Sequence, residues 1–204
     1  MAIRDVKKDY IIDTAQRLFL SRSVSDVTVR DIAQTADVGE ATVYRYFEKK
    51  QNIVLGVAKK LSAEVYAEHF SPPGGKTGYK KLKRFYNGYL SVYTEHPEFC
   101  RFLREFDMLL LSGDDMPLGE YEKELDVYRD FYMKAYREGI ADGSVAEQAD
   151  IGLFYYATTH ALLELCKKFG GEKDLLPQDT KSDKAGEIAT LIGLVLNALK
   201  KTRA

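Results

Sequence analysis

Residues 28–47 read TVRDIAQTADVGEATVYRYF and contain two short runs of helical spacing, separated by a turn. Thr28 and Asp31 have the spacing of a capping box, so a helix is expected to begin directly after Thr28. In the second run, Val43 and Phe47 lie one turn apart and are expected to face a core. Because both helices are too short to be stable alone, neighbouring helices must support them. The pattern predicts a helix-turn-helix.

The side of the second short helix that faces away from this core carries hydrogen-bonding groups. If Val43 and Phe47 point inward, six residues remain on the outside: Glu40, Ala41, Thr42, Tyr44, Arg45 and Tyr46. A helix face of this width fits the major groove of DNA. The sequence therefore predicts that this helix contacts DNA.

Three stretches give the chain a close resemblance to the TetR family of bacterial repressors, over about residues 8–56. The first helix ends in Leu18-Phe19, the next begins with Thr28-Val-Arg-Asp-Ile-Ala33, and the third continues as Thr42-Val-Tyr-Arg-Tyr-Phe-Glu-Lys-Lys50. Beyond this region the chain is similar to the family only in length and helix pattern. The outward helix face and the resemblance together give ten candidate DNA-contacting residues: Thr28, Arg30, Gly39, Glu40, Ala41, Thr42, Tyr44, Arg45, Tyr46 and Lys50.

The resemblance also implies how these residues divide their work. Arg30 and Arg45 are the candidates for base edges, because a guanidinium bonds guanine in a bidentate manner. Tyr46 and Lys50 would mostly bind phosphates, and Thr28 would offer its hydroxyl to the DNA backbone. Together these roles predict a reader of a specific DNA sequence.

Some positions leave alternatives open. Tyr44 could instead pack within the domain, and Lys50 could be an ordinary solvated lysine. Three positions depart from the family pattern: Ser23 and Asp37 replace glycines, and Gly39 replaces the usual Ser or Thr cap of the DNA-contacting helix. Asp tolerates a left-handed backbone and glycine is an acceptable N-cap, so a lost function is not expected. Gly39 offers no hydroxyl to a phosphate, however, and phosphate would repel the Glu40 carboxylate, so somewhat weaker nonspecific affinity is expected.

Helical spacing continues through the rest of the chain, without sustained strand-like alternation or an internal repeat. The first helix is expected at about Val6–Ser21 and the fourth at about Lys50–Phe70, with a break at residues 71–75. Further helices are expected at Gly78–Glu95, Pro97–Ser112, Glu120–Ile140, Ala146–Phe169 and Ser182–Lys201, with a loop at Gly170–Lys181. The predicted fold is all-α: an N-terminal three-helix helix-turn-helix DNA-binding domain at residues 1–50, and a C-terminal helical ligand-binding and dimerisation domain at residues 51–204.

Aromatic residues recur at helical spacing in the second domain. A buried tyrosine hydroxyl needs a hydrogen-bond partner, so many inward tyrosines predict a cavity with polar points. Plain core packing is the alternative for each residue. We expect this cavity to bind a small, mostly apolar effector that lowers DNA affinity. The residues expected to line the cavity are Tyr89, Tyr93, Phe102, Phe106, Asp107, Tyr128, Tyr132, Tyr155, Thr159 and His160.

The last two long helices carry apolar stripes that predict a homodimer. One stripe contains Ile151, Phe154, Thr158, Leu162, Leu165 and Phe169, and the other contains Ile188, Leu191, Ile192, Val195, Leu196 and Leu199. Two such helices from each protomer can form a four-helix interface, and a two-fold dimer predicts a palindromic operator. The alternative is that these stripes are buried within one protomer.

Composition limits the other classes of function. A formal net charge of −1 argues against a histone-like binder, so a DNA-binding hypothesis must depend on the motif. Cys100 and Cys166 lie far apart and are expected to be reduced thiols of a cytoplasmic protein. His69, His96 and His160 are widely spaced and show no recognisable metal site.

No catalytic arrangement is readable, and no cofactor is expected. Gly74-Gly-Lys-Thr77 resembles the end of a phosphate-binding loop, but its required first glycine would fall at Phe70. The charged start of the chain and its short apolar runs predict neither a secretory signal nor a membrane span. The alternative function is a helical adaptor or a degenerate regulator without specific DNA binding.

Overall fold

The computed structural model describes residues 3–70, 74–113, 116–171 and 176–201. The described residues form the α-helices α1 (Ile3–Ser21), α2 (Val29–Thr35), α3 (Glu40–Phe47), α4 (Lys50–Phe70), α5 (Gly78–Glu95), α6 (Pro97–Leu111), α7 (Gly119–Ala141), α8 (Ile151–Phe169) and α9 (Lys184–Leu199), with short 3-10 helices η1 (Val24–Asp26) and η2 (Asp179–Lys181). The predicted all-α class is confirmed. Residues 71–73 of the predicted break after α4 lie outside the described residues.

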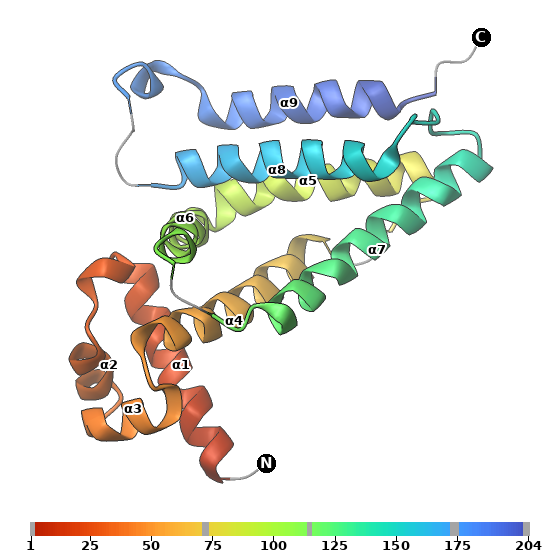
Figure 1. Cartoon of the computed structure of the whole chain (residues 1–204). Helices are drawn as coiled ribbons and strands as arrows, with labels where there is room; N and C mark the ends of the chain where they lie inside the picture. The colour runs from red at the N-terminus through yellow and green to blue at the C-terminus, as the bar shows by residue number, and fades with distance from the viewer. Residues whose placement is uncertain (1–2, 71–73, 114–115, 172–175, 202–204) are drawn as a thin grey trace.

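Helices α1, α2 and α3 gather at one end of the molecule, and α4 leads from them into the larger group of helices (Figure 1). In that larger group, α8 and α9 run side by side, and α7 crosses the view diagonally (Figure 1). Helix α5 packs against α4, α6, α7, α8 and α9, so it is the central helix of the larger group. The connector α4 thus joins the helix-turn-helix to the larger group of helices.

The two groups of helices share one apolar core. Phe19 of α1 stacks on Phe102 of α6 with ring centroids 6.2 Å apart, and Phe102 stacks on Phe106 at 6.4 Å. At the far end, α5 and α7 meet closely: a Cβ on Gly78 would lie 2.1 Å from the backbone nitrogen of Gly139. A glycine at this crossing therefore permits a backbone contact that any side chain would prevent.

Helix α8 begins at Ile151 and not at Ala146, as the sequence pattern predicted. The preceding residues are extended, because Val145 pairs with Lys200 and the Ala146 N–H donates to the Leu199 carbonyl at 2.8 Å. Asp150 then starts the helix by accepting a hydrogen bond from the Leu153 N–H at 2.9 Å. A contact between distant segments thus shortens the helix.

Candidate nucleic-acid interface and ligand cavity

The two short helices are fixed at their ends by local hydrogen bonds. The Thr28 hydroxyl accepts from the Asp31 N–H at 3.1 Å, and the Asp31 carboxylate accepts from the Thr28 N–H at 2.8 Å, which is the predicted capping box. These bonds hold the pKa of Asp31 below its ordinary value of 3.8. In the turn, Asp37 takes the left-handed conformation that its replacement of glycine required, with φ +52°.

Helix α3 turns one face inward and leaves the other open. Val43 and Phe47 are buried, whereas Glu40, Ala41, Tyr44 and Arg45 are exposed and Thr42 and Tyr46 are half-buried. The Tyr44 side chain is 48% exposed, so it is not a core residue and the packing alternative for it does not hold. The arginines and tyrosines of this face are therefore available to a partner.

The remaining predicted DNA contacts lie around this face. The Arg45 guanidinium lies over the Tyr46 ring, 5.4 Å from its centroid. Arg30 is exposed in the first turn of α2, and Gly39 is the exposed N-cap of α3 without a side-chain capping bond. The exposed Thr28 hydroxyl also donates to the Asp31 carboxylate, so it already has a partner within the domain.

Lys50 has a structural role that the sequence did not reveal. Its ammonium group donates a hydrogen bond to the Val24 carbonyl of η1, and its side chain is half-buried. Burial lowers the pKa of Lys50, although neighbouring carboxylates, led by Asp26, oppose that shift. Two residues later, the Asn52 side-chain amide donates to the Phe47 carbonyl at 2.8 Å and closes the end of α3. The start of α4 thus holds both η1 and the exposed helix in place.

A cavity of about 190 Å³ lies among α4, α5, α7 and α8. Of the ten predicted ligand-binding residues, the cavity is lined by Tyr89, Tyr128, Tyr155, Thr159 and His160. The prediction missed eight further lining residues: Tyr66, Phe70, Phe85, Leu125, Asp126, Arg129, Tyr156 and Leu163. Burial raises the pKa of Tyr155 to about 12, so this phenol stays neutral near pH 7.

The other five predicted ligand residues lie elsewhere. Phe102 and Phe106 belong to the core that joins α1 to α6, and Tyr93 packs against Phe169 with ring centroids 6.4 Å apart. Asp107 pairs with the Lys167 ammonium group at 2.5 Å. Their helical spacing indicated burial correctly for Phe102 and Phe106, whereas Tyr93 and Asp107 are half-buried, and it did not indicate where a cavity lies.

Tyr132 is buried beside the cavity without lining it. Its hydroxyl hydrogen-bonds to the Tyr86 hydroxyl at 3.1 Å, and Tyr86 also bonds to the Thr158 hydroxyl at 2.7 Å. These hydroxyls satisfy one another, so they need no ligand. Buried tyrosines in this chain therefore serve the core as well as the cavity.

Arg129 is the cationic residue of the cavity wall. Its Nε is buried and has no hydrogen-bond partner among the described residues, and its guanidinium lies 5.4 Å from the centroid of the Tyr156 ring. An unpaired donor on a guanidinium is costly to bury, and an acceptor group on a ligand would satisfy it. The cavity thus combines mostly aromatic walls with the Arg129 guanidinium and the Asp126 carboxylate.

Helices α8 and α9 also carry exposed apolar residues on one edge of the molecule. Leu153 of α8 is 67% exposed and Leu194 of α9 is 63% exposed. Further exposed or half-exposed residues continue the two faces: Tyr156, Ala157 and Ala161 on α8, and Ala189, Thr190 and Gly193 on α9. By contrast, most of the apolar stripe predicted for the last helix is buried within the protomer: Ile188, Ile192, Val195, Leu196 and Leu199.

Comparison with known proteins assigns this architecture. The profile described as "Bacterial regulatory proteins, tetR family" matches residues 11–57. The transcriptional repressor KstR2 of Mycolicibacterium smegmatis is 24% identical over 157 residues, which cover 73% of this chain and 72% of that protein. KstR2 of Rhodococcus jostii is 22% identical over 151 residues, with the same coverage. These relatives are transcriptional regulators and not enzymes.

Solved structures share the fold along most of the chain. FadR from Bacillus subtilis superimposes with a TM-score of 0.65 at 20% identity, covering 93% of this chain and 97% of its own. A TetR-family regulatory protein from Rhodococcus RHA1 reaches 0.66 at 16% identity, covering all of both chains. In the part of the chain that the structure describes, no helix meets the length and apolarity needed to cross a membrane. The N-terminal helix-turn-helix thus matches the DNA-binding region of TetR-family regulators, and the chain as a whole is similar to transcriptional regulators of that family.

Proposed function

We propose that the chain is a repressor that binds a palindromic operator as a homodimer and releases it when a small, mostly apolar effector binds. The observation that carries this proposal is the exposed face of α3, where Tyr44 and Arg45 point away from a core that holds Val43 and Phe47. Asn52 and Lys50 fix this helix from the start of α4. A rigid polar helix face of this kind suits the major groove.

The roles of the DNA-contacting residues follow from their positions. Arg30, Tyr44 and Arg45 are exposed and would approach base edges, while Tyr46 and Thr28 would bond phosphates. Lys50 would have to leave the Val24 carbonyl to reach a phosphate. We therefore assign Lys50 first to holding η1, and only second to the DNA backbone.

The homodimer would form through the exposed faces of α8 and α9, around Leu153 and Leu194. Helices α8 and α9 lie side by side, and both lie well away from α3 (Figure 1). An isologous interface there would present two copies of α3 to one duplex about 34 Å apart. This interface would use the two helices that the sequence indicated, but a different face of each, because the predicted stripes are largely buried or half-buried within the protomer.

The effector would bind in the cavity among α4, α5, α7 and α8. A volume of about 190 Å³ is below the range of about 300–1,000 Å³ that holds drug-sized ligands, so a larger effector would have to displace aromatic rings. One structural relative is described as a ketosteroid transcriptional regulator and another was solved with stearoyl-CoA, which supports an apolar class of ligand. Arg129 would bond an acceptor or anionic group of that ligand.

A larger cleft of about 720 Å³ lies along α1 and α4, but its chemistry is different. Charged residues line it, and the Lys60–Asp13 ion pair joins the two helices there. An apolar effector would have to desolvate these charges, which is unfavourable. We therefore place the effector in the smaller aromatic cavity.

Helix α4 would carry the signal between the two sites. Tyr66 and Phe70 near its end line the cavity, while Lys50 and Asn52 at its start hold η1 and α3. A ligand that moves the aromatic end of α4 would therefore change the spacing of the two α3 helices in the dimer. Only differential affinity for the two arrangements would produce release.

The test is DNA binding by the full chain across a salt series, with operators selected from a random duplex library. Binding should weaken with a log–log slope of about −0.9 for each phosphate contacted. Tyr44→Ala should reduce sequence preference by about 1–3 kcal/mol for the affected base pair, without loss of folding. Tyr10→Ala is a matched control, because Tyr10 is 49% exposed on α1. Selection of no sequence, or equal behaviour of both variants, would favour the adaptor or degenerate regulator instead.

A further inference from the structure

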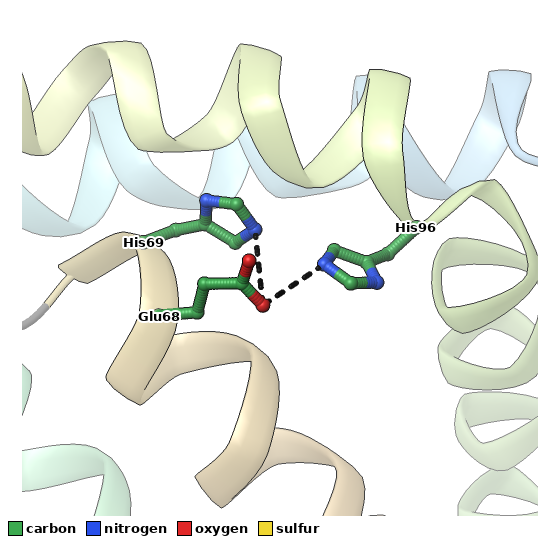
Figure 2. A group of neighbouring side chains, drawn as sticks. All are labelled: Glu68, His69 and His96. Atoms are coloured by element: carbon green, nitrogen blue, oxygen red, sulfur yellow. Dashed lines mark ion pairs between the residues drawn. The ribbon is translucent and has the colours of Figure 1, made fainter.

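Two of the three histidines meet beside a carboxylate at the far end of the connector helix. Glu68 and His69 lie in the last turn of α4, and His96 lies between α5 and α6, 27 positions after His69. Figure 2 shows the Glu68 carboxylate between the two imidazole rings. The fold therefore unites side chains whose spacing in the sequence gave no sign of a site.

The donor atoms are close enough to share one ion. One ligand atom from each residue lies within 4.8 Å of the others. The Glu68 Oε2 is 3.4 Å from the His96 Nε2 and 4.0 Å from the His69 Nε2 (Figure 2). In a tetrahedral zinc site with bonds of about 2.0–2.2 Å, neighbouring ligand atoms lie about 3.4 Å apart. Small side-chain rotations would bring all three donors to that spacing.

The two imidazole nitrogens that face the carboxylate are also unsatisfied. The Nε2 atoms of His69 and His96 are buried and make no hydrogen bond within the described residues. The His69 side chain is only 8% exposed, so solvent cannot easily replace the missing partner. Glu68 lies within ion-pair distance of both nitrogens but makes a hydrogen bond to neither, so a cation held between the three groups would satisfy all of them.

We propose that Glu68, His69 and His96 bind a divalent transition metal, with Zn²⁺ as the best fit. Imidazole nitrogen and carboxylate oxygen are zinc ligands, and two nitrogens with one oxygen leave a fourth position for water or another donor. Hard cations such as Mg²⁺ prefer a shell of oxygens, so they match this donor set poorly. At 58% exposure, Glu68 leaves the site open to solvent on one side.

Metal binding would clamp the end of α4 to the corner between α5 and α6. His69 is next to Phe70, which lines the ligand cavity, so the clamp would restrict the part of α4 that an effector must move. This regulatory consequence depends on the proposed function, whereas the metal site itself does not. The two are therefore tested by separate measurements.

The direct test is metal binding to the full-length chain, freed of any histidine tag and of bound metal by a chelator. Titration with Zn²⁺ followed by calorimetry should give one site per chain, and Mg²⁺ should not compete. Co²⁺ should give the visible absorption of a low-symmetry nitrogen and oxygen site. At 100 times the dissociation constant, Zn²⁺ should raise the Tm by about 5–10 °C.

Substitution of each proposed ligand tests whether the ion binds at this cluster. His69→Gln, His96→Gln and Glu68→Gln should each weaken Zn²⁺ binding at least tenfold, while His160→Gln should leave it unchanged because the exposed His160 lies on α8, outside the cluster. Glu95→Gln is the matched carboxylate control, since Glu95 is exposed at the end of α5. His96, at 25% exposure, is the replacement least expected to disturb folding.

The outcomes separate the two proposals. No Zn²⁺ uptake at micromolar concentration, or uptake that survives His96→Gln with a folded circular dichroism spectrum, overturns the metal site. Uptake with these ligands, together with operator affinity that does not change with Zn²⁺, retains the site and removes only the clamp. Failure of operator binding both with and without Zn²⁺ would count against the repressor and leave the metal result standing.

Discussion

The candidate site of the helix-turn-helix lies outside its core, whereas the candidate site of the larger group of helices, α4 to α9, lies inside. In α3, the core takes Val43 and Phe47 and leaves Tyr44 outside, so the candidate site is what packing does not use. In the larger group of helices, Tyr89 and Tyr155 line a cavity among residues that look like ordinary core. An exposed site can thus be predicted from the residues of a helix that do not belong to its apolar face. An internal site can be predicted only when it is known where the core is incompletely packed.

The junction between these two regions should give the largest effect when it is broken. The Arg101 guanidinium on α6 donates to the carbonyls of Phe19 and Leu20 at 2.9 and 2.8 Å, and to that of Arg22 at 3.1 Å. It also pairs with Glu105 at 3.1 Å. Arg101→Met leaves these carbonyls without their donor and removes the cation beside Glu105, so the free energy of unfolding should fall by about 3–5 kcal/mol in urea denaturation at fixed protein concentration.

Two further variants make the junction result specific. Arg101→Lys keeps the charge but cannot reach several carbonyls at once, so its loss should be intermediate. Arg137→Met, at an exposed position of α7, should stay within about 0.5 kcal/mol of the parent. If Arg101→Met were as stable as Arg137→Met, Arg101 would not couple the stability of the two groups of helices.

Within the larger group of helices, the exposed and buried faces of α9 should respond differently to a charge. Leu194→Asp places a carboxylate on the proposed dimer face and should raise the dimer dissociation constant by about a hundredfold, with a folded monomer. Ile188→Asp places it in the core, where Ile188 is fully buried, and should unfold the protomer. Sedimentation equilibrium and circular dichroism measure the two effects. An unchanged dimer in the Leu194 variant would move the interface to another face.

One substitution in the core and one in the cavity wall should affect different quantities, the free energy of unfolding and the effector affinity. Tyr132→Phe removes one hydroxyl, but Tyr86 keeps its bond to Thr158, so the free energy of unfolding should fall by only about 1 kcal/mol. Arg129→Gln should weaken effector binding by about tenfold and change stability less. Each variant is the control for the other. Equal losses of effector affinity would mean that core and cavity are not distinct here.

Local chemistry explains what the sequence revealed in the first region. The Thr28–Asp31 capping box and the Glu40–Phe47 helix depend on residues within one or two turns of each other, so their spacing shows in the chain itself. The residues that hold α3 in place were missed. Asn52 resembles any polar residue at a helix start, and only the fold brings it to the Phe47 carbonyl.

In the second region, periodicity indicated which residues are inside but not what surrounds them. Phe106 was predicted to line the cavity and instead packs in the core, because helical spacing does not distinguish a filled interior from a hollow one. Arg129 was missed because a charged residue on a helix is ordinarily solvated. His69 and His96 are joined only by the packing of α4 against the corner of α5 and α6.

The smallest expected effect is on the acid stability of the helix-turn-helix, through Asp31. Hydrogen bonds from Thr28 hold the folded-state pKa of Asp31 below its ordinary value of 3.8. The carboxylate therefore stabilises the folded state at pH values above about 4, and this contribution is lost as the pH falls through the lower folded-state pKa. Asp31→Asn removes the charge but keeps an acceptor, so the stability gap between parent and variant should close between about pH 5 and pH 2. Asp37→Asn, in the turn, keeps a residue that tolerates φ +52° and should show the parent's acid dependence. A gap that persists unchanged at pH 2 would mean that the capping box depends on shape alone and not on the ionised carboxylate.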